Sequence, residues 1–378
     1  MSDQLAREAR PLDGHAPAAR DEARIPILLV TGFLGSGKTT LINRLLKTRR
    51  YARTAVVVNE FGEVSVDHML IEAPKRRMRV VDGGCLCGHV HEEVATSLLD
   101  LASHRRAGGD AHFDHALIET SGLADPVPII QVLLADSAVT EHFELQAVIA
   151  AVDGVHGGSH LDNHVEPLKQ AAVADVIIIT KADLAAPPQL DSIEARIAAI
   201  NPGAQRIRAV RGDVDSSIFD KAGYAPAALS AQAAEWLNDA DYASATPAAS
   251  ADPSIHTFTL THEEPITAPG FVLWMHLLAG FRGAGLLRVK GIVNVEGEPY
   301  AVQAVQSIIS EPVPLECWPD QHDRFSRLVF ITRGMDEAAV KRTFGAFRFE
   351  GGRDARNLTI RPETYARFRE TIQLFRQP

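Results

Sequence analysis

The stretch that most constrains the fold is a glycine-rich loop between an apolar run and a helical pattern. The run 27–30 leads into the loop 32–40, which reads GFLGSGKTT, and an amphipathic segment follows at 41–46. The spacing G-x-x-x-x-G-K-T places glycines where a backbone closes around phosphate oxygens, and the start of the following helix faces the same charge. The sequence therefore predicts a P-loop that binds a nucleotide.

The expected roles within this loop follow from the chemistry of its side chains. Lys38 should reach the β- and γ-phosphates, and the Thr39 hydroxyl should bind Mg²⁺. We expect the nucleotide phosphates to contact Gly32, Gly35, Ser36, Gly37, Lys38, Thr39 and Thr40.

Short apolar runs alternate with longer amphipathic ones through the first half of the chain. This alternation predicts an α/β fold with a mainly parallel sheet and helices on both faces. After each run comes a polar residue, at the strand end where open α/β sheets bind their ligands. The runs are 27–30, 55–58, 116–118, 148–152 and 176–179, and the polar residues that follow them include Glu60, Glu119, Asp153 and Lys181.

A chain of 378 residues is long for a single core, so we expect two domains. The P-loop domain should span 25–238, and a small-residue stretch at 239–254 reads as a linker. The remainder, 255–378, predicts a smaller α+β domain with an antiparallel sheet and helices on one face. Its expected strands are 256–260, 286–295, 300–309 and 327–331, with a turn at 295–299, and its expected helices are 269–278 and 337–347.

Composition limits the partners and the compartment. Lys and Arg number 38 against 48 Asp and Glu, a net charge of −10, and no basic stretch is interleaved with aromatics, so we expect no nucleic-acid partner. No apolar run reaches the ~18 residues that span a bilayer. Residues 1–24 lack an apolar core and read as a disordered extension, and three cysteines suit a reducing cytoplasm.

Two further motifs follow predicted strands. In 119–122, which reads ETSG, Glu119 could hold Mg²⁺ and the Gly122 N–H could meet the γ-phosphate; alone, such an acid could equally cap a helix. In 180–183, which reads TKAD, the Asp183 carboxylate could accept hydrogen bonds from guanine N1 and N2, while the Lys181 stem lies along the base. GTPases commonly carry N-K-x-D at this place, so Thr180 stands where Asn is common in them. Its hydroxyl can still bond the P-loop backbone. The alternative for this motif is a plain surface loop.

The segment 83–91, which reads GGCLCGHVH, predicts a metal site. Cys85 and Cys87 can face one metal, and sulfur with imidazole suits Zn²⁺. Candidates for the remaining ligands are His89, His91, Glu60, Glu63 and Asp67. The alternative is a pair of buried cysteines in a turn. The histidines at 156, 160 and 164 could share a helix face, but two glycines at its start favour a solvated loop. Cys317 reads as a packed core or loop residue.

Six motifs in order resemble the CobW-type P-loop GTPases, which include zinc metallochaperones and activators of metalloenzymes: GFLGSGKTT, VVVNEFGEVSVD, GGCLCG, IETSGLADP, VDGVH and TKADL. LLRVKGIV and RLVFI resemble the C-terminal domain of that family. The resemblance implies that Lys38 and Thr39 bind phosphate and Mg²⁺, that Glu119 belongs to the Mg²⁺ and switch region, and that Asp183 reads guanine. It also implies a metal site at a C-x-C-C motif, whose third cysteine is replaced by Gly88 here. Either His89 or Glu63 completes the shell, giving a weaker or more labile site, or this chain binds metal differently.

From these features we expect a cytoplasmic Mg²⁺-dependent GTPase that binds GTP and GDP and delivers Zn²⁺ or another transition metal to a client metalloprotein. Two alternatives remain open: a small-molecule P-loop kinase, and a metal-binding adaptor with an idle GTPase site. The kinase needs an acceptor site and an arginine lid, which the sequence does not display, and it has no need of the Lys181 and Asp183 pair.

Overall fold

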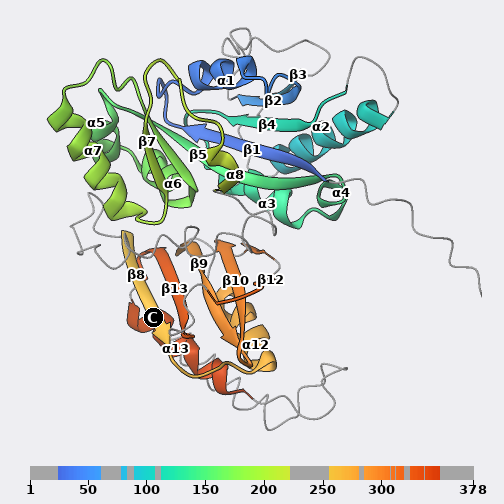
Figure 1. The fold of residues 1–378 in the computed structure, drawn as a ribbon, viewed down its shortest axis with the longest axis vertical. Helices are drawn as coiled ribbons and strands as arrows, with labels where there is room; N and C mark the ends of the chain where they lie inside the picture. The colour runs from blue at the N-terminus through green and yellow to red at the C-terminus, as the bar shows by residue number, and fades with distance from the viewer. Residues whose placement is uncertain are drawn as a thin grey trace, which may run out of the picture.

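The computed structural model describes residues 24–60, 78–82, 89–106, 112–221, 255–280, 285–306, 308–310, 312–318, 324–335 and 337–349. These residues form two sheets, each with its own helices, and Figure 1 shows the C-terminal sheet below the N-terminal domain. The expected extension and the linker lie outside the described residues, so the domain boundaries stay a prediction.

The N-terminal domain is a seven-stranded sheet of order β3-β2-β4-β1-β5-β6-β7, with every described strand pair parallel. Its strands are β1 (Ile25–Gly32), β2 (Thr54–Glu60), β3 (Met78–Asp82), β4 (His115–Thr120), β5 (Phe143–Asp153), β6 (Val176–Thr180) and β7 (Gln205–Arg208). Its helices are α1 (Lys38–Lys47), α2 (His89–Arg106), α3 (Val127–Ala135), α4 (Ser137–Thr140), α5 (Gly157–Asn163), α6 (Val165–Val173), α7 (Pro187–Ile200) and α8 (Ile218–Lys221).

Helices cover both faces of this sheet, which confirms the predicted fold class. Alternate residues of each strand point to opposite faces. On β1, Leu28 and Val30 pack with α1 and α8, whereas Ile27 and Leu29 pack with α2 and α3. The helices α5, α6 and α7 pack on the β5 and β6 part of that second face. The five predicted strands are all present, and β3 and β7 are additional.

The C-terminal domain is a six-stranded sheet of order β11-β10-β9-β13-β8, with β12 paired to β10, and its described pairs are antiparallel. Its elements are β8 (Ile255–His262), α12 (Ala268–Gly280), β9 (Leu286–Val295), β10 (Glu298–Val305), β11 (Ile308–Ile309), β12 (Val313–Pro314), β13 (Ser326–Arg333), α13 (Glu337–Thr343) and the 3₁₀ helix η3 (Phe344–Arg348). The predicted turn is confirmed: Glu296 and Gly297 both have positive φ, as a tight hairpin requires. Trp274 of α12 is fully buried beneath the sheet.

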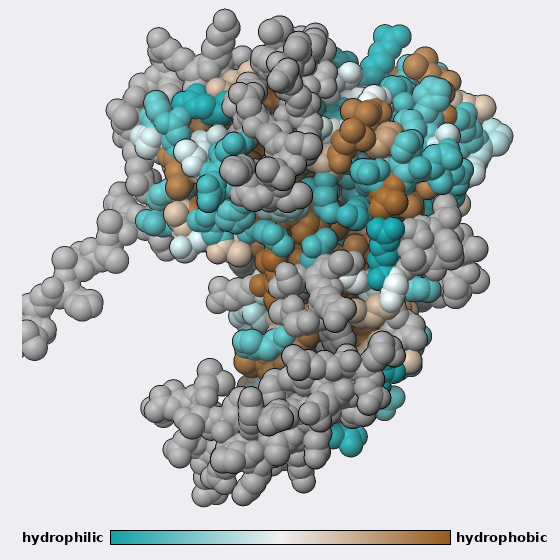
Figure 2. All heavy atoms as spheres, turned by 180° about the vertical axis from the view of Figure 1, so that it is seen from behind, coloured by the Kyte–Doolittle hydropathy of each residue, from teal (hydrophilic) through white to brown (hydrophobic). Residues whose placement is uncertain are grey.

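The two domains share a hydrophobic core. Ile255, Leu287 and Ile331 from three C-terminal strands join the cluster that α6 and α7 form with β6. Figure 2 shows hydrophobic surface in the region where the domains adjoin. Among the described helices, none combines the length and apolar character that a membrane span needs.

A buried ion pair crosses the junction. The Arg288 guanidinium of β9 donates to the Asp175 carboxylate and to the Val173 carbonyl. The other Asp175 oxygen accepts the Val148 N–H at 2.9 Å, so one carboxylate holds β5 and β9 together. The Arg288 and Asp175 side chains are only 4% and 1% exposed. A buried charge that loses its partner costs far more than an exposed one, so this pair matters to the docking of the domains.

We predict that Asp175→Ala lowers the free energy of unfolding by about 3 kcal/mol, because it removes the carboxylate from the buried Arg288 guanidinium. Urea denaturation of the full chain, followed by tryptophan fluorescence, measures the effect. The control is Glu337→Ala, which removes the exposed ion pair with Lys341 and should leave the midpoint almost unchanged. Equal shifts in the two variants would contradict a special role for the junction pair.

Candidate functional site

The P-loop connects β1 to α1, and its glycines are required by its backbone. Gly35 and Gly37 have φ of 69° and 87°, in the left-handed region that glycine adopts without strain. At Gly32 an added Cβ would lie 2.5 Å from the Ala151 carbonyl oxygen of β5, so only glycine fits there. The predicted strand, loop and helix are therefore confirmed at the predicted residues.

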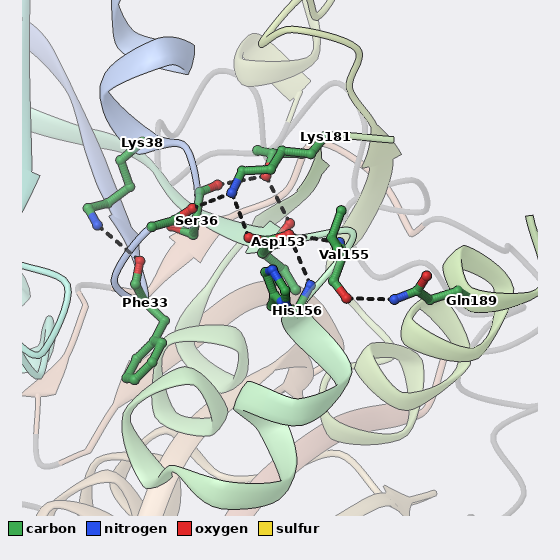
Figure 3. A network of polar contacts seen from close by, with 11 residues as sticks. Phe33, Ser36, Lys38, Asp153, Val155, His156, Lys181 and Gln189 are labelled. Atoms are coloured by element: carbon green, nitrogen blue, oxygen red, sulfur yellow. Dashed lines mark hydrogen bonds and ion pairs between the residues drawn. The ribbon is translucent and has the colours of Figure 1, made fainter. Parts of the chain in front are cut away.

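Lys38, in the first turn of α1, lies against the loop it follows. Its Nζ donates to the carbonyls of Gly32 at 2.8 Å and Phe33 at 3.2 Å, as Figure 3 shows for Phe33. Thr39 is the next residue and is partly buried, while Thr40 is exposed. The lysine and the threonine hydroxyl thus begin the helix at the place where a P-loop presents them to phosphate and Mg²⁺.

The end of β4 and the loop that follows it lie directly beside the P-loop. Glu119 of β4 pairs in register with Val30 of β1 and is 3% exposed. Gly122 contacts the P-loop so closely that an added Cβ would lie 2.7 Å from the Leu34 amide nitrogen. A buried carboxylate and the Thr39 hydroxyl are hard oxygen donors of the kind that Mg²⁺ prefers, so the residues fit this ion, and they would hold it against the phosphates.

Gln170 of α6 also supports this loop, and sequence reasoning missed it. Its side-chain amide donates to the carbonyls of Gly122 and Ala124, each at 3.2 Å. Gln170 is 1% exposed and lies 48 residues after Gly122, so no local pattern pointed to it.

The loop predicted to read the base begins where β6 ends. The Thr180 hydroxyl is 2.6 Å from the carbonyl oxygen of Ser36, which confirms that threonine here bonds the P-loop backbone. The Asp183 side chain is 29% exposed and lies 3.9 Å from the Arg211 guanidinium. Arg211 follows β7 in a turn with φ of 51°, and sequence reasoning did not single it out.

The structure corrects the prediction of a solvated loop at the three histidines. Residues 157–163 form helix α5, and His156, His160 and His164 lie along it with ring centroids 6.1 and 6.4 Å apart. The Phe33 ring of the P-loop packs against His160 and His164, at 4.8 and 4.6 Å. The helix forms despite its initial glycines because Gly157 packs on β5, where an added Cβ would lie 2.8 Å from Val152. Burial beside His156, His164 and Lys181 lowers the pKa of His160, although Asp153 opposes the shift.

Most of the predicted zinc ligands fall in segments that the structure does not describe. Cys85, Cys87, Gly88, Glu63 and Asp67 lie outside the described residues, as do the side chains of Glu60 and His89, so the zinc site stays a prediction. Within the described residues, no group of three or more His, Cys, Asp or Glu is placed to hold a metal. Cys317, predicted to be a packed core or loop residue, is exposed, so it is not a core residue.

The two strands that precede the predicted zinc-ligand segments end side by side. Glu60, at the end of β2, pairs in register with Asp82, at the end of β3. In the sequence, Glu63 follows the end of β2 by three residues and Cys85 follows the end of β3 by three. Since the sheet is parallel, these ends belong to the edge that carries the P-loop.

Comparison with known proteins agrees with this geometry. The family model described as CobW/HypB/UreG, nucleotide-binding domain, matches residues 26–208, and the cobalamin synthesis protein cobW C-terminal domain matches 255–348. The chain is 30% identical over 331 residues to the zinc chaperone YjiA of Escherichia coli, spanning 86% of this chain and 99% of the relative. It is also 30% identical over 355 residues to the zinc chaperone CobW of Pseudomonas aeruginosa, spanning 84% and 90%.

A solved structure gives the same result for the fold. The Zn(II)-bound YjiA GTPase from E. coli superposes with a TM-score of 0.61 at 26% identity, covering 86% of this chain and 99% of that one. Two domain models in the expected order, a full-length relative and a shared fold thus agree with the motifs at the sheet edge: the chain belongs to the CobW family of P-loop GTPases.

Proposed function

We propose that this protein is a Mg²⁺-dependent GTPase that couples GTP binding and hydrolysis to the binding of Zn²⁺ and its delivery to a client metalloprotein in the cytoplasm. The observation that carries the proposal is the edge of the N-terminal sheet. There the P-loop, Glu119 and the TKAD loop lie together, and the paired ends of β2 and β3 lead into the segments with Glu63, Cys85 and Cys87. The names of the relatives, zinc chaperones, support the choice of metal.

The proposed coupling depends on the fact that neighbouring strands of the sheet lead into the two sites. Glu119 pairs with Val58 of β2 as well as with Val30 of β1, so β4 lies between the P-loop strand and the strand that leads to Glu63. A γ-phosphate and its Mg²⁺ order the loops that contact them, and hydrolysis releases those loops. Such a change at this edge would alter the ligands that are offered together with Cys85 and Cys87.

A matched pair of lysines in α1 tests the hydrolytic role. Lys38→Ala should reduce kcat for GTP by about 100-fold or more, because it removes the cation that neutralises charge on the transferred phosphate. Phosphate release at saturating GTP measures the rate. Lys47→Ala, at the exposed end of the same helix, should retain full turnover, and normal hydrolysis by the Lys38 variant would contradict the proposal.

The role of Asp183 in base selection has a test based on hydrogen-bond donors. Asp183→Asn should weaken GDP binding by about 100-fold, because an amide cannot accept hydrogen bonds from both the N1–H and the N2 amino group of guanine. The same variant should gain affinity for xanthosine diphosphate, whose base carries a carbonyl in place of that amino group. Competition between the two diphosphates measures the change in their relative affinities. Undiminished GDP binding, or effective competition by ATP in the unaltered chain, would contradict guanine selection and favour the kinase alternative.

The zinc site is tested with all three cysteines. Replacing Cys85 and Cys87 by Ser should weaken Zn²⁺ binding by about 100-fold, because two thiolate ligands are lost. Titration against a chromophoric chelator, with GDP and with a non-hydrolysable GTP analogue, measures the affinity in each nucleotide state. Cys317→Ser is the control and should bind Zn²⁺ normally, since that cysteine is exposed in the C-terminal domain. An unaltered titration in the double variant would remove the metal from the proposal and leave the GTPase.

A further inference from the structure

The buried carboxylate of Asp153 lies beside the TKAD loop, residues 180–183, which we call the base loop. No motif so far has given this carboxylate a role. Asp153 is the last residue of β5, pairs in register with Thr180 of β6 and is 2% exposed. Its Oδ1 accepts the backbone N–H groups of Val155 at 2.7 Å and His156 at 3.1 Å. Its Oδ2 accepts from the Lys181 ammonium at 2.7 Å. The two carboxylate oxygens thus have different partners.

Lys181 is held from two sides. Its Nζ donates to Oδ2 of Asp153 and, at 2.8 Å, to the carbonyl of Gly35 in the P-loop. Its backbone φ is 54°, a conformation that residues other than glycine rarely adopt. Figure 3 shows the ammonium of Lys181 reaching from the base loop toward Asp153 and the P-loop. The lysine therefore links the base loop to the phosphate loop, and Asp153 fixes where its charge lies.

The segment after Asp153 is itself anchored, which keeps the carboxylate in place. The Gln189 side chain in the first turn of α7 donates to the Val155 carbonyl. Only glycine fits at position 154, because an added Cβ would lie 2.6 Å from the Thr180 carbonyl oxygen. The Gly154 N–H donates a hydrogen bond to that same oxygen at 2.8 Å. The ends of β5 and β6 are thereby joined next to the two loops that contact the nucleotide.

The geometry points to Asp153 as a positioning residue for guanine-nucleotide binding, one that acts through Lys181 by holding its ammonium against the P-loop carbonyl of Gly35. This inference rests on the proposed function, because it assumes that Lys181 lies along the base. Asp153 itself contacts neither base nor phosphate in this role. The effect of losing its charge should therefore depend on whether Lys181 is present.

The protonation state of Asp153 agrees with this role. Burial by itself raises the pKa of Asp153, but the hydrogen bonds from Lys181 and from the His156 and Val155 N–H groups together lower it below the usual aspartate value. Since the pKa is lowered in the folded chain, the stabilisation is present above the ordinary aspartate pKa, about 4, and is lost only as the pH falls through the folded value. At neutral pH the carboxylate is charged and the ion pair is intact.

A double-mutant cycle on the full chain tests the inference. Asp153→Asn keeps an oxygen for the two backbone N–H groups and removes the charge that faces Lys181. Lys181→Met keeps the apolar stem and removes the ammonium. In the otherwise unaltered chain, Asp153→Asn should weaken the binding of fluorescent GDP by about tenfold, the size expected for a partly buried charge-assisted hydrogen bond. In the Lys181→Met background, the same change should weaken GDP binding by less than about twofold.

The readouts distinguish positioning from a general loss of structure. We expect Asp153→Asn to raise KM for GTP with little change in kcat, because the phosphate-binding residues are untouched. Asp162→Asn is the matched control: it removes an exposed ion pair to Arg196 in the same domain and should leave GDP affinity unchanged. Should Asp153→Asn fail to fold, Lys181→Met and Lys181→Arg still provide a test, since arginine keeps the charge beside Asp153 and should bind GDP more tightly than methionine does.

The possible failures are separable. Equal losses of GDP affinity in both backgrounds, or no loss in either, would overturn the role of Asp153 and leave guanine binding in place. Equal GDP affinity of the Lys181→Met and Lys181→Arg variants would overturn it as well. If the unaltered chain bound no GDP, both the proposed function and this inference would fail.

Discussion

The site depends on how the backbone carbonyls of the P-loop are satisfied. A loop that turns its N–H groups toward phosphate turns carbonyls the other way, and these need donors from elsewhere in the fold. Three side chains supply them: Lys38 to Gly32 and Phe33, Lys181 to Gly35, and Thr180 to Ser36. Two of the donors come from the loop that is expected to read the base. The loops proposed to bind the phosphates and the base therefore share one set of hydrogen bonds.

The strand β6 connects this site to the domain junction. Thr180 and the start of the base loop lie at its carboxyl end, while Asp175, which pairs with Arg288 of the C-terminal sheet, directly precedes its amino end. Five residues of strand span roughly 16 Å. The strand is buried along its whole length and packs with α6 and α7, which also contact the C-terminal domain. The two domains thus meet through the same element that supports the base loop.

Local chemistry allowed much of the fold and the site to be predicted. The apolar runs located β1, β2, β4, β5 and β6, because a buried parallel strand needs apolar residues on both faces, although β5 begins five residues before its predicted run. Short or polar strands were missed: β7, which reads QRIR, has no apolar run to mark it. The histidine helix α5 was also missed, because propensity disfavours glycine in a helix, whereas packing of Gly157 on Val152 requires it.

The sequence by itself determined the chemistry of the nucleotide site: the glycines of the P-loop, Lys38 and Thr39, the acid Glu119 and the TKAD loop, each marked by residues that lie close together in the chain. Only the tertiary structure decided which side chains hold these loops in place. Thr180 is 144 residues from Ser36, and Asp153 is 28 residues from Lys181. Contacts over such separations depend on strand order and register, which place β5 next to β1 and β6 next to β5, and no local pattern encodes them.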